Sequence, residues 1–417
     1  MTIKKYFVAI LSAALLVCAQ SGSAENDASL MRPACQMPII TPKPEDDQLT
    51  FGLYSWQVFI AANWPASQLY RGEPDCEKLI TDTGPRVWQT YKTSNEVFLR
   101  DAKNPGSWND GYEAGAAVKV EQAAKATNNT VIEAHMEAVG KWLIDQKGNP
   151  TYFQMLVNKP WYDYVVNNNF YDRNNFSEST RINLPIQSME VKAAWRIMTD
   201  FDDRSRYITQ KSTVVNFDSN AKPKGTSDVV LGLVGLHLTI KAVGFPQWIW
   251  ATFEHVDNVP DSIYDASTNK VVSQPKVGVN YSYYNASATK VNQSPCLLSD
   301  PNDCLPFTTP NPLSRLTPIR SGAVSANQQY QNGPIVKGSV LENYQLVATQ
   351  WPSMPNNPSV TNGMPTPTIS ANTSMESYIQ SSSSCMNCHG MAKLPGLQVK
   401  SDYSYLFNQA NNASTNQ

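Results

Sequence analysis

Alternating apolar and polar residues in the middle of the chain predict a series of β-strands. The segments Trp142–Asp145 and Thr151–Val157 flank a turn that contains Gly148 and Pro150, a pattern typical of a hairpin. Further strands are expected over Met189–Met198, Arg206–Phe217, Val229–Lys241, Gln247–Val256 and Lys276–Tyr284. The third and fourth of these would form one hairpin that turns at Gly244–Pro246.

Helical periodicity lies on either side of this strand-rich region. Between Gly52 and Gly148 it occurs in pieces, the clearest being Trp56, Phe59, Ile60 and Asn63. Near the other end, Ser339–Gln350 has an amphipathic pattern that stops before Pro352. Thr373 and Glu376 fit a capping box and predict a helix that runs towards Cys385. We therefore expect an α+β fold, a large β-rich domain with flanking helices followed by a short helical C-terminal segment.

Residues 1–24 have the pattern of a secretory signal peptide. Two lysines in residues 1–5 precede an apolar run, Tyr6–Val17, that is too short to span a bilayer, and Gly22–Ala24 offers small residues for cleavage. Cys18 as a lipoprotein anchor is less favoured, because Val17 stands where such signals normally have a small residue. We expect an exported bacterial protein, periplasmic or at the cell surface, whose mature chain has no transmembrane segment.

The mature chain divides into three expected parts. Residues 25–352 would form the α+β domain with long loops, residues 353–370 a proline-rich connector, and residues 371–417 the C-terminal segment. The formal net charge of −2 argues against a nucleic-acid partner. The sequence contains no phosphate-binding glycine loop, no Gly-x-Ser-x-Gly elbow and no His-Glu-x-x-His helix, so hydrolase and nucleotide-dependent functions lack support.

The strongest chemical signal is the pattern Cys-x-x-Cys-His formed by Cys385, Cys388 and His389. With 7 Cys and 4 His in 417 residues, chance would produce roughly 0.001 such matches. A structural zinc site needs a further ligand pair nearby, and no Cys or His follows His389. A thioredoxin-like dithiol would begin a helix early in a domain, whereas this pair lies near the end of the chain. Covalent haem attachment is therefore the favoured interpretation.

The motif resembles that of c-type cytochromes, over the five positions Cys385 to His389. The resemblance implies one covalent haem c attached to Cys385 and Cys388, with His389 as the proximal iron ligand, and usually electron transfer. In the common small cytochromes an axial Met follows the motif by some tens of residues. Here the Met that follows is Met391, which is too near to reach the other haem face. The iron is then either open on this side or bound by a distal ligand that comes from the preceding domain.

The candidates for that ligand are His255, Met354 and His237, in this order. On the expected hairpin His255 shares an apolar face, which suits either a core histidine or the wall of a haem pocket. His237 lies on a mixed face, and Met354 and Met364 belong to the connector and could loop back over the ring. His135, between two glutamates, has the pattern of a solvated helix face.

The cysteine count agrees with export. Removing the signal peptide and the two haem cysteines leaves an even number, which suggests disulfides in an oxidising compartment. Proximity favours the pairs Cys35 with Cys76 and Cys296 with Cys304 among three possible connectivities.

Two functions remain open on the sequence. The favoured one is a monohaem electron carrier that docks a redox partner protein. The alternative is a c-haem enzyme, peroxidase- or oxygenase-like, that binds a small-molecule substrate in the large domain. The size of that domain favours the enzyme, and the lack of a legible acid–base constellation favours the carrier.

Overall fold

An antiparallel sheet organises the protein. The structure, a computed structural model, describes residues 35–112, 142–218, 221–268, 270–288, 291–296, 305–306 and 309–413. Within them eight strands form one sheet in the order β1-β2-β3-β5-β6-β11-β12, with β4 paired to β5. These strands are β1 (Lys92–Thr93), β2 (Tyr152–Val157), β3 (Met189–Ile197), β4 (Thr209–Phe217), β5 (Pro223–Ala242), β6 (Phe245–His255), β11 (Tyr344–Pro352) and β12 (Pro365–Thr366). The predicted α+β class is confirmed.

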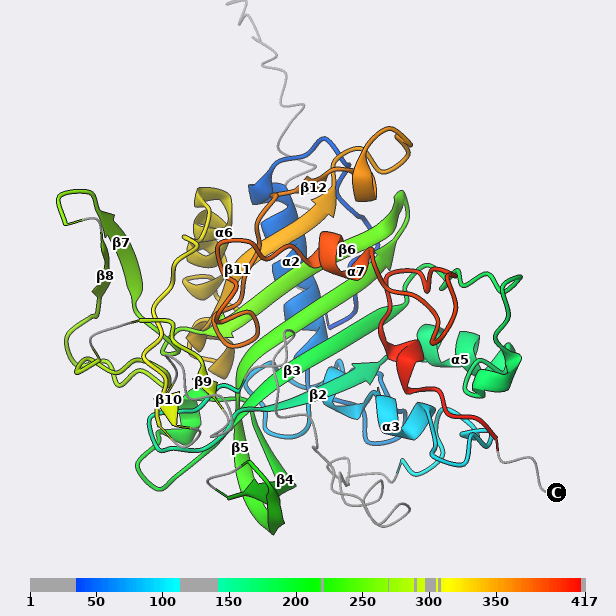
Figure 1. The fold of residues 1–417 in the computed structure, drawn as a ribbon, viewed down its shortest axis with the longest axis horizontal. Coiled ribbons are helices and arrows are strands. Elements are labelled where there is room, and N and C mark those ends of the chain that lie inside the picture. The colour runs from blue at the N-terminus through cyan, green and yellow to red at the C-terminus, as the bar shows by residue number, and fades with distance from the viewer. Residues whose placement is uncertain are drawn as a thin grey trace, which may run out of the picture.

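Smaller elements surround the sheet (Figure 1). The α-helices are α2 (Gln48–Ala62), α3 (Ser94–Val97), α5 (Lys159–Asn167), α6 (Ser321–Gln331) and α7 (Cys385–His389). Two short ladders, β7 (Asp261–Asp265) with β8 (Lys270–Gln274) and β9 (Pro295–Cys296) with β10 (Leu305–Pro306), stand apart from the main sheet.

Helices α2 and α6 cover one face of the sheet, behind the strands in Figure 1. On α2, Trp56 and Phe59 both pack on Phe253 of β6, with ring centroids 5.3 and 4.1 Å apart. Gly52 lets α2 approach closely, because a Cβ there would lie 3.0 Å from the Ala326 Cβ of α6. Burial of these aromatic side chains makes this face the main hydrophobic core.

The strands of the central hairpin form where the sequence predicts them. β5 and β6 are rich in β-branched and aromatic residues and pair in antiparallel register. The turn between them contains Gly244 at φ 81°, a conformation that favours glycine. The predicted segments Met189–Met198 and Arg206–Phe217 correspond to β3 and β4. For Trp142–Asp145 the structure has an isolated bridge, Ile144 to Pro150, instead of a strand.

Two predicted elements differ in the structure, and for the first of them long-range strand pairing decides the conformation. The amphipathic segment Ser339–Gln350 is not a helix: it contains a 3-10 turn over Val340–Asn343, and β11 follows it and pairs with β6. Lys276–Tyr284 forms turns and loop instead of a strand.

The helix predicted after Thr373 is also absent, and the residues there form turns. Thr373 Oγ1 donates to Glu254 Oε2 at 2.7 Å, and Glu376 Oε2 accepts the Asn372 backbone N–H at 2.9 Å. Both side chains of the expected capping box are thus used in other contacts, which removes the helix start.

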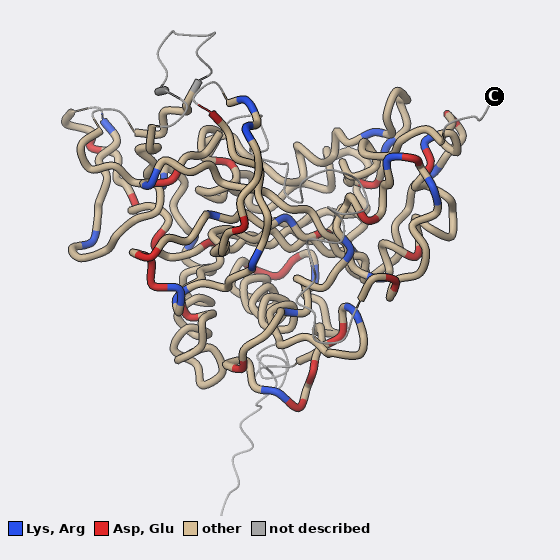
Figure 2. Tube along the Cα trace, turned by 90° about the horizontal axis from the view of Figure 1, so that it is seen from below, with Lys and Arg blue, Asp and Glu red and all other residues tan. Residues whose placement is uncertain are grey.

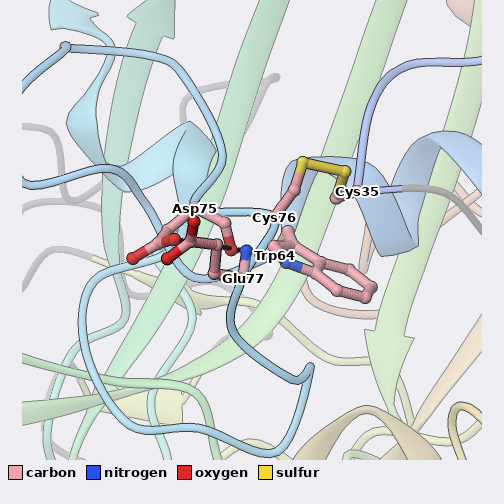
Figure 3. Close-up of a disulfide and its surroundings, with 5 residues drawn as sticks. All are labelled: Cys35, Trp64, Asp75, Cys76 and Glu77. Atoms are coloured by element: carbon pink, nitrogen blue, oxygen red, sulfur yellow. Dashed lines mark hydrogen bonds between the residues drawn. A yellow bond between two sulfur atoms is a disulfide. The ribbon is translucent and has the colours of Figure 1, made fainter.

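A disulfide joins Cys35 to Cys76, with Cα atoms 5.5 Å apart, as the cysteine spacing predicts (Figure 3). Beside it, Trp64 Nε1 donates to the Asp75 carbonyl at 3.1 Å. The Cys296–Cys304 pair stays a prediction, because Cys304 lies outside the described residues, as do the signal peptide and His135.

Among the described residues, every helix is too short or too polar to cross a bilayer. Lys and Arg are interspersed with Asp and Glu over the described chain (Figure 2).

Candidate haem-attachment site

The face of the sheet opposite α2 carries polar side chains, because successive residues of a strand point to opposite faces. We call it the polar face. Its residues are Glu190 and Lys192 on β3, His237, Thr239 and Lys241 on β5, Trp250, Thr252 and Glu254 on β6, and Gln350 on β11. Most of them are buried, so their hydrogen-bonding groups need protein partners.

The C-terminal residues 371–413 supply these partners. They lie in front of the sheet, drawn orange to red in Figure 1. Asn372 Nδ2 donates to Thr252 Oγ1 at 2.9 Å, and the Met386 backbone N–H donates to Gln350 Oε1 at 2.9 Å. The segment that carries the Cys-x-x-Cys-His motif is thus fixed to the sheet by directional bonds, which set its orientation as well as its position.

The motif itself forms α7, a helix of 5 residues that begins at Cys385. The sequence predicts Cys385 near the end of a helix, but in the structure Ser384 acts as N-cap and the helix begins at Cys385. Cys385 and Cys388 lie three residues apart on one helical turn, and both thiols are unpaired. Cys385 is half-buried and Cys388 is exposed. Burial raises the pKa of Cys385 to about 12, so this thiol is protonated at neutral pH.

One ring nitrogen of His389 is hydrogen-bonded, and the other makes no hydrogen bond within the described residues. Its Nδ1 lies 2.8 Å from the backbone carbonyl of Tyr403, and because a carbonyl can only accept, Nδ1 carries the proton. Nε2 then has a free lone pair. Burial lowers the pKa of His389 to about 4, which keeps the imidazole neutral. The ring packs against Trp250 and Tyr405, with centroids 4.5 and 5.3 Å away.

A buried ion pair supports the Tyr403 carbonyl. Asp402 and Tyr403 have φ of 53° and 68°, a left-handed conformation that costs about 1 kcal/mol or more for each such residue. Lys241 Nζ lies 2.7 Å from both carboxylate oxygens of Asp402, and the Leu184 N–H donates to the same carboxylate at 2.7 Å. The sheet thereby holds the turn that orients His389.

His237 lies on the polar face, the same face as His389. Its β5 position pairs with Thr252 of β6, two residues from Trp250, on which the His389 ring packs. His237 Nε2 is buried and makes no direct hydrogen bond in the described part of the chain, but it interacts with Glu376: burial raises the pKa of that carboxyl, and the His237 side chain together with other polar neighbours more than offsets this, so the pKa is lowered overall. The Glu376 carboxylate lies 3.6 Å from this nitrogen, within ion-pair range but beyond hydrogen-bond distance.

His255 is a core histidine on the other face. It is fully buried, stacks on Tyr207 with centroids 4.0 Å apart and pairs with Tyr344. Nε2 donates to the Arg206 carbonyl at 3.0 Å, and Nδ1 accepts the Asp257 N–H at 3.1 Å. Both nitrogens are therefore in use, and the residue ranked first as distal ligand is not brought to the motif.

The connector methionines lie near α7 but face solvent. Met354 and Met364 are 45% and 46% exposed. The Met354 N–H donates to the Gly363 carbonyl at 2.8 Å, and the neighbouring Asn362 Nδ2 donates to Asn387 Oδ1 of α7 at 3.2 Å. The connector is thus folded against α7 and is paired to the sheet through β12.

These residues fit a covalently attached haem. Two unpaired thiols on one helical turn adjoin an imidazole with a free nitrogen, and a second buried imidazole nitrogen without a partner lies on the same face. The described residues contain no cluster of three or more Cys, His, Asp or Glu placed to hold an ion.

Sequence reasoning missed Lys241, Asp402 and Glu376, which support the two histidines. No local pattern marks them, since their contacts join residues far apart in the chain. Asp402 and Tyr403, near the C-terminus, belong to no recognisable sequence motif.

A cavity of about 370 Å³ lies elsewhere, between α2, the start of α5 and the β5–β6 turn. Its lining includes Tyr54, Arg71, Tyr91 and Trp108 but no residue of the C-terminal segment. It is therefore not part of the motif's surroundings.

Comparison of the chain with protein-family models, with curated proteins and with solved structures gave no match.

Proposed function

We propose that this chain is an exported c-type haem protein that transfers electrons through one covalently attached haem. The observation that carries the proposal is the arrangement of α7: unpaired Cys385 and Cys388 lie on one turn beside His389, whose Nδ1 is engaged so that Nε2 is available. The signal-peptide pattern and the Cys35–Cys76 disulfide support export to an oxidising compartment.

In this proposal Cys385 and Cys388 hold the haem, and His389 is the proximal ligand. The haem supplies one-electron redox chemistry when bound. The chain's own residues orient the ligand: the Tyr403 carbonyl fixes the His389 tautomer, and such a partner also raises the basicity of the ligating nitrogen. Trp250 and Tyr405 restrict the rotation of the imidazole by packing on it.

The exposure of Cys388 favours electron transfer over substrate chemistry. It would place one thioether edge of the macrocycle at the surface, where a redox partner protein can approach. A c-haem enzyme is the second candidate, because His237 and Glu376 lie close together on the polar face and a histidine–carboxylate couple is suited to proton transfer.

The test is a pyridine haemochrome assay on protein exported from a host that matures c-type cytochromes. The native chain should contain one haem that stays bound after acid–acetone extraction. Cys385→Ala and Cys388→Ala should each lower the covalent haem content, and the double variant should abolish it. Cys35→Ser with Cys76→Ser, which removes two cysteines elsewhere, is the matched control and should keep the haem. Native protein without covalent haem would disprove the proposal.

A further inference from the structure

We infer that His237 is the second axial ligand, bound to the haem iron through Nε2 on the face opposite His389. The inference rests on the proposed function and adds the ligation state. It would make the iron six-coordinate, as expected of an electron carrier, and would close it to exogenous ligands.

Strand register places His237 on the correct face. His237 is paired with Lys192 of β3 on one side and with Thr252 of β6 on the other. Trp250, the next residue of β6 with the same orientation, contacts the His389 ring. The two imidazoles thus come from opposite sides, one from the sheet and one from the segment that covers it.

The donor atom is available. His237 Nε2 is buried and makes no direct hydrogen bond within the described residues, a costly condition for a polar atom that is retained where the atom has another use. Glu376 lies 3.6 Å from His237 Nε2 but is anchored separately, by the Asn372 N–H at 2.9 Å. The carboxylate therefore keeps a hydrogen-bond donor if Nε2 binds iron.

The other candidates lack this combination. His255 has both nitrogens engaged on the opposite face. Met354 and Met364 are nearly half exposed, although a distal ligand must lie against the buried face of the ring. His135 lies outside the described residues and enters the test as a variant.

The test uses the optical and electron paramagnetic resonance spectra of the full-length haem protein. The native ferric form should be low-spin, without the weak near-infrared band of methionine ligation, and the ferrous form should not bind carbon monoxide rapidly. His237→Ala should convert the iron to a high-spin, carbon monoxide-binding state with unchanged covalent haem content. His237→Met should keep a low-spin iron and introduce the near-infrared methionine band. His135→Ala and Glu376→Gln, the controls, should stay low-spin.

The outcomes separate the inference from the proposed function. A native protein with covalent haem that is high-spin and binds carbon monoxide would overturn the inference and favour the enzyme, while leaving haem attachment intact. Loss of the low-spin signal in His135→Ala or Met354→Ala instead of His237→Ala would also overturn it. Absence of covalent haem would overturn both.

Discussion

A carboxylate on the polar face should make stability depend on pH near neutrality. Glu190 of β3 is 6% exposed, and its Oε1 accepts the indole N–H of Trp161 at 2.9 Å. Burial raises its pKa from 4.5 to about 7, while hydrogen bonds from Ser404 and Trp161 act in the opposite direction. We therefore consider Glu190→Gln, which keeps the shape and the acceptor but removes the charge.

The magnitude follows from linkage between protonation and folding. The folded pKa of about 7 exceeds the unfolded value of 4.5, and each unit corresponds to 1.36 kcal/mol, so the effect of ionising Glu190 is about 3 kcal/mol. Because the folded state binds the proton more tightly, the contribution to stability is fully present below pH 4.5 and is lost as the pH rises through 7.

A buried histidine acts in the opposite direction. Burial lowers the pKa of His255 to about 4, so its contribution to stability is present above the unfolded value of about 6.5 and is lost as the pH falls towards 4. The native stability curve is a sum of these effects. The difference between Glu190→Gln and the native protein isolates Glu190, since His255 is common to both.

The assay is urea unfolding of both proteins at several pH values from 4 to 8. The variant should gain about 3 kcal/mol relative to the native protein between pH 4 and pH 8. A constant offset at all pH values is allowed, because the amide can pack differently from the acid. Glu178→Gln, the same change at an exposed position, is the matched control and should give a flat difference. A flat difference for Glu190→Gln as well would refute the reasoning.

Three further predictions use other parts of the fold. Asp402→Asn leaves Lys241 buried without its partner and should lower the free energy of unfolding by about 3–5 kcal/mol in urea; a loss below about 1 kcal/mol would contradict the importance of this pair. Gly235→Ala brings a Cβ to 3.1 Å from Met375 Cε and still closer to Ser374 Oγ. This overpacking should lower the free energy of unfolding by about 1–3 kcal/mol and, by displacing the C-terminal segment, shift the haem spectrum. An unchanged melting temperature and spectrum would argue against this contact. The Cys35–Cys76 disulfide closes a loop of 41 residues, so its reduction should lower the free energy of unfolding by about 4 kcal/mol. Reductant should therefore lower the urea midpoint of the native protein. The double variant Cys35→Ser with Cys76→Ser should have the same lower midpoint in the absence of reductant.

The parts of the fold that the sequence predicts are those where local preference and tertiary environment agree. β5 and β6 combine β-branched and aromatic residues with a Gly244 turn, so each signal supports the hairpin. The segment that forms β11 has the sequence pattern of an amphipathic helix, yet it is a strand in the structure because it pairs with β6 in the sheet. Helix α6 has few apolar residues and no clear pattern, and it is buried through Ala323, Ala326 and Tyr330 against α2.

The candidate site divides in the same way. Cys385, Cys388 and His389 are close together in the sequence, so the sequence alone indicates their chemistry. The surroundings of the other histidines cannot be predicted in this way, because the face of the sheet on which an imidazole lies depends on strand register, and its contacts depend on which segment covers that face. His255 lies on an apolar face, as the sequence predicts, but α2 covers that face, whereas the motif approaches the mixed face of His237.

The size of the chain, which at the level of sequence favours an enzyme, has another explanation in the structure. The contacts that hold the C-terminal segment span long stretches of sequence: Thr373 and Glu254 are 119 residues apart, and Lys241 and Asp402 are 161 residues apart. A segment anchored in this way depends on the assembled sheet, because its polar groups have their partners there. In the proposed function, the large domain is then the scaffold that orients one haem ligand through Tyr403 and supplies the other from β5. If His237 binds the iron as inferred, the ligation state decides between carrier and enzyme better than chain length does.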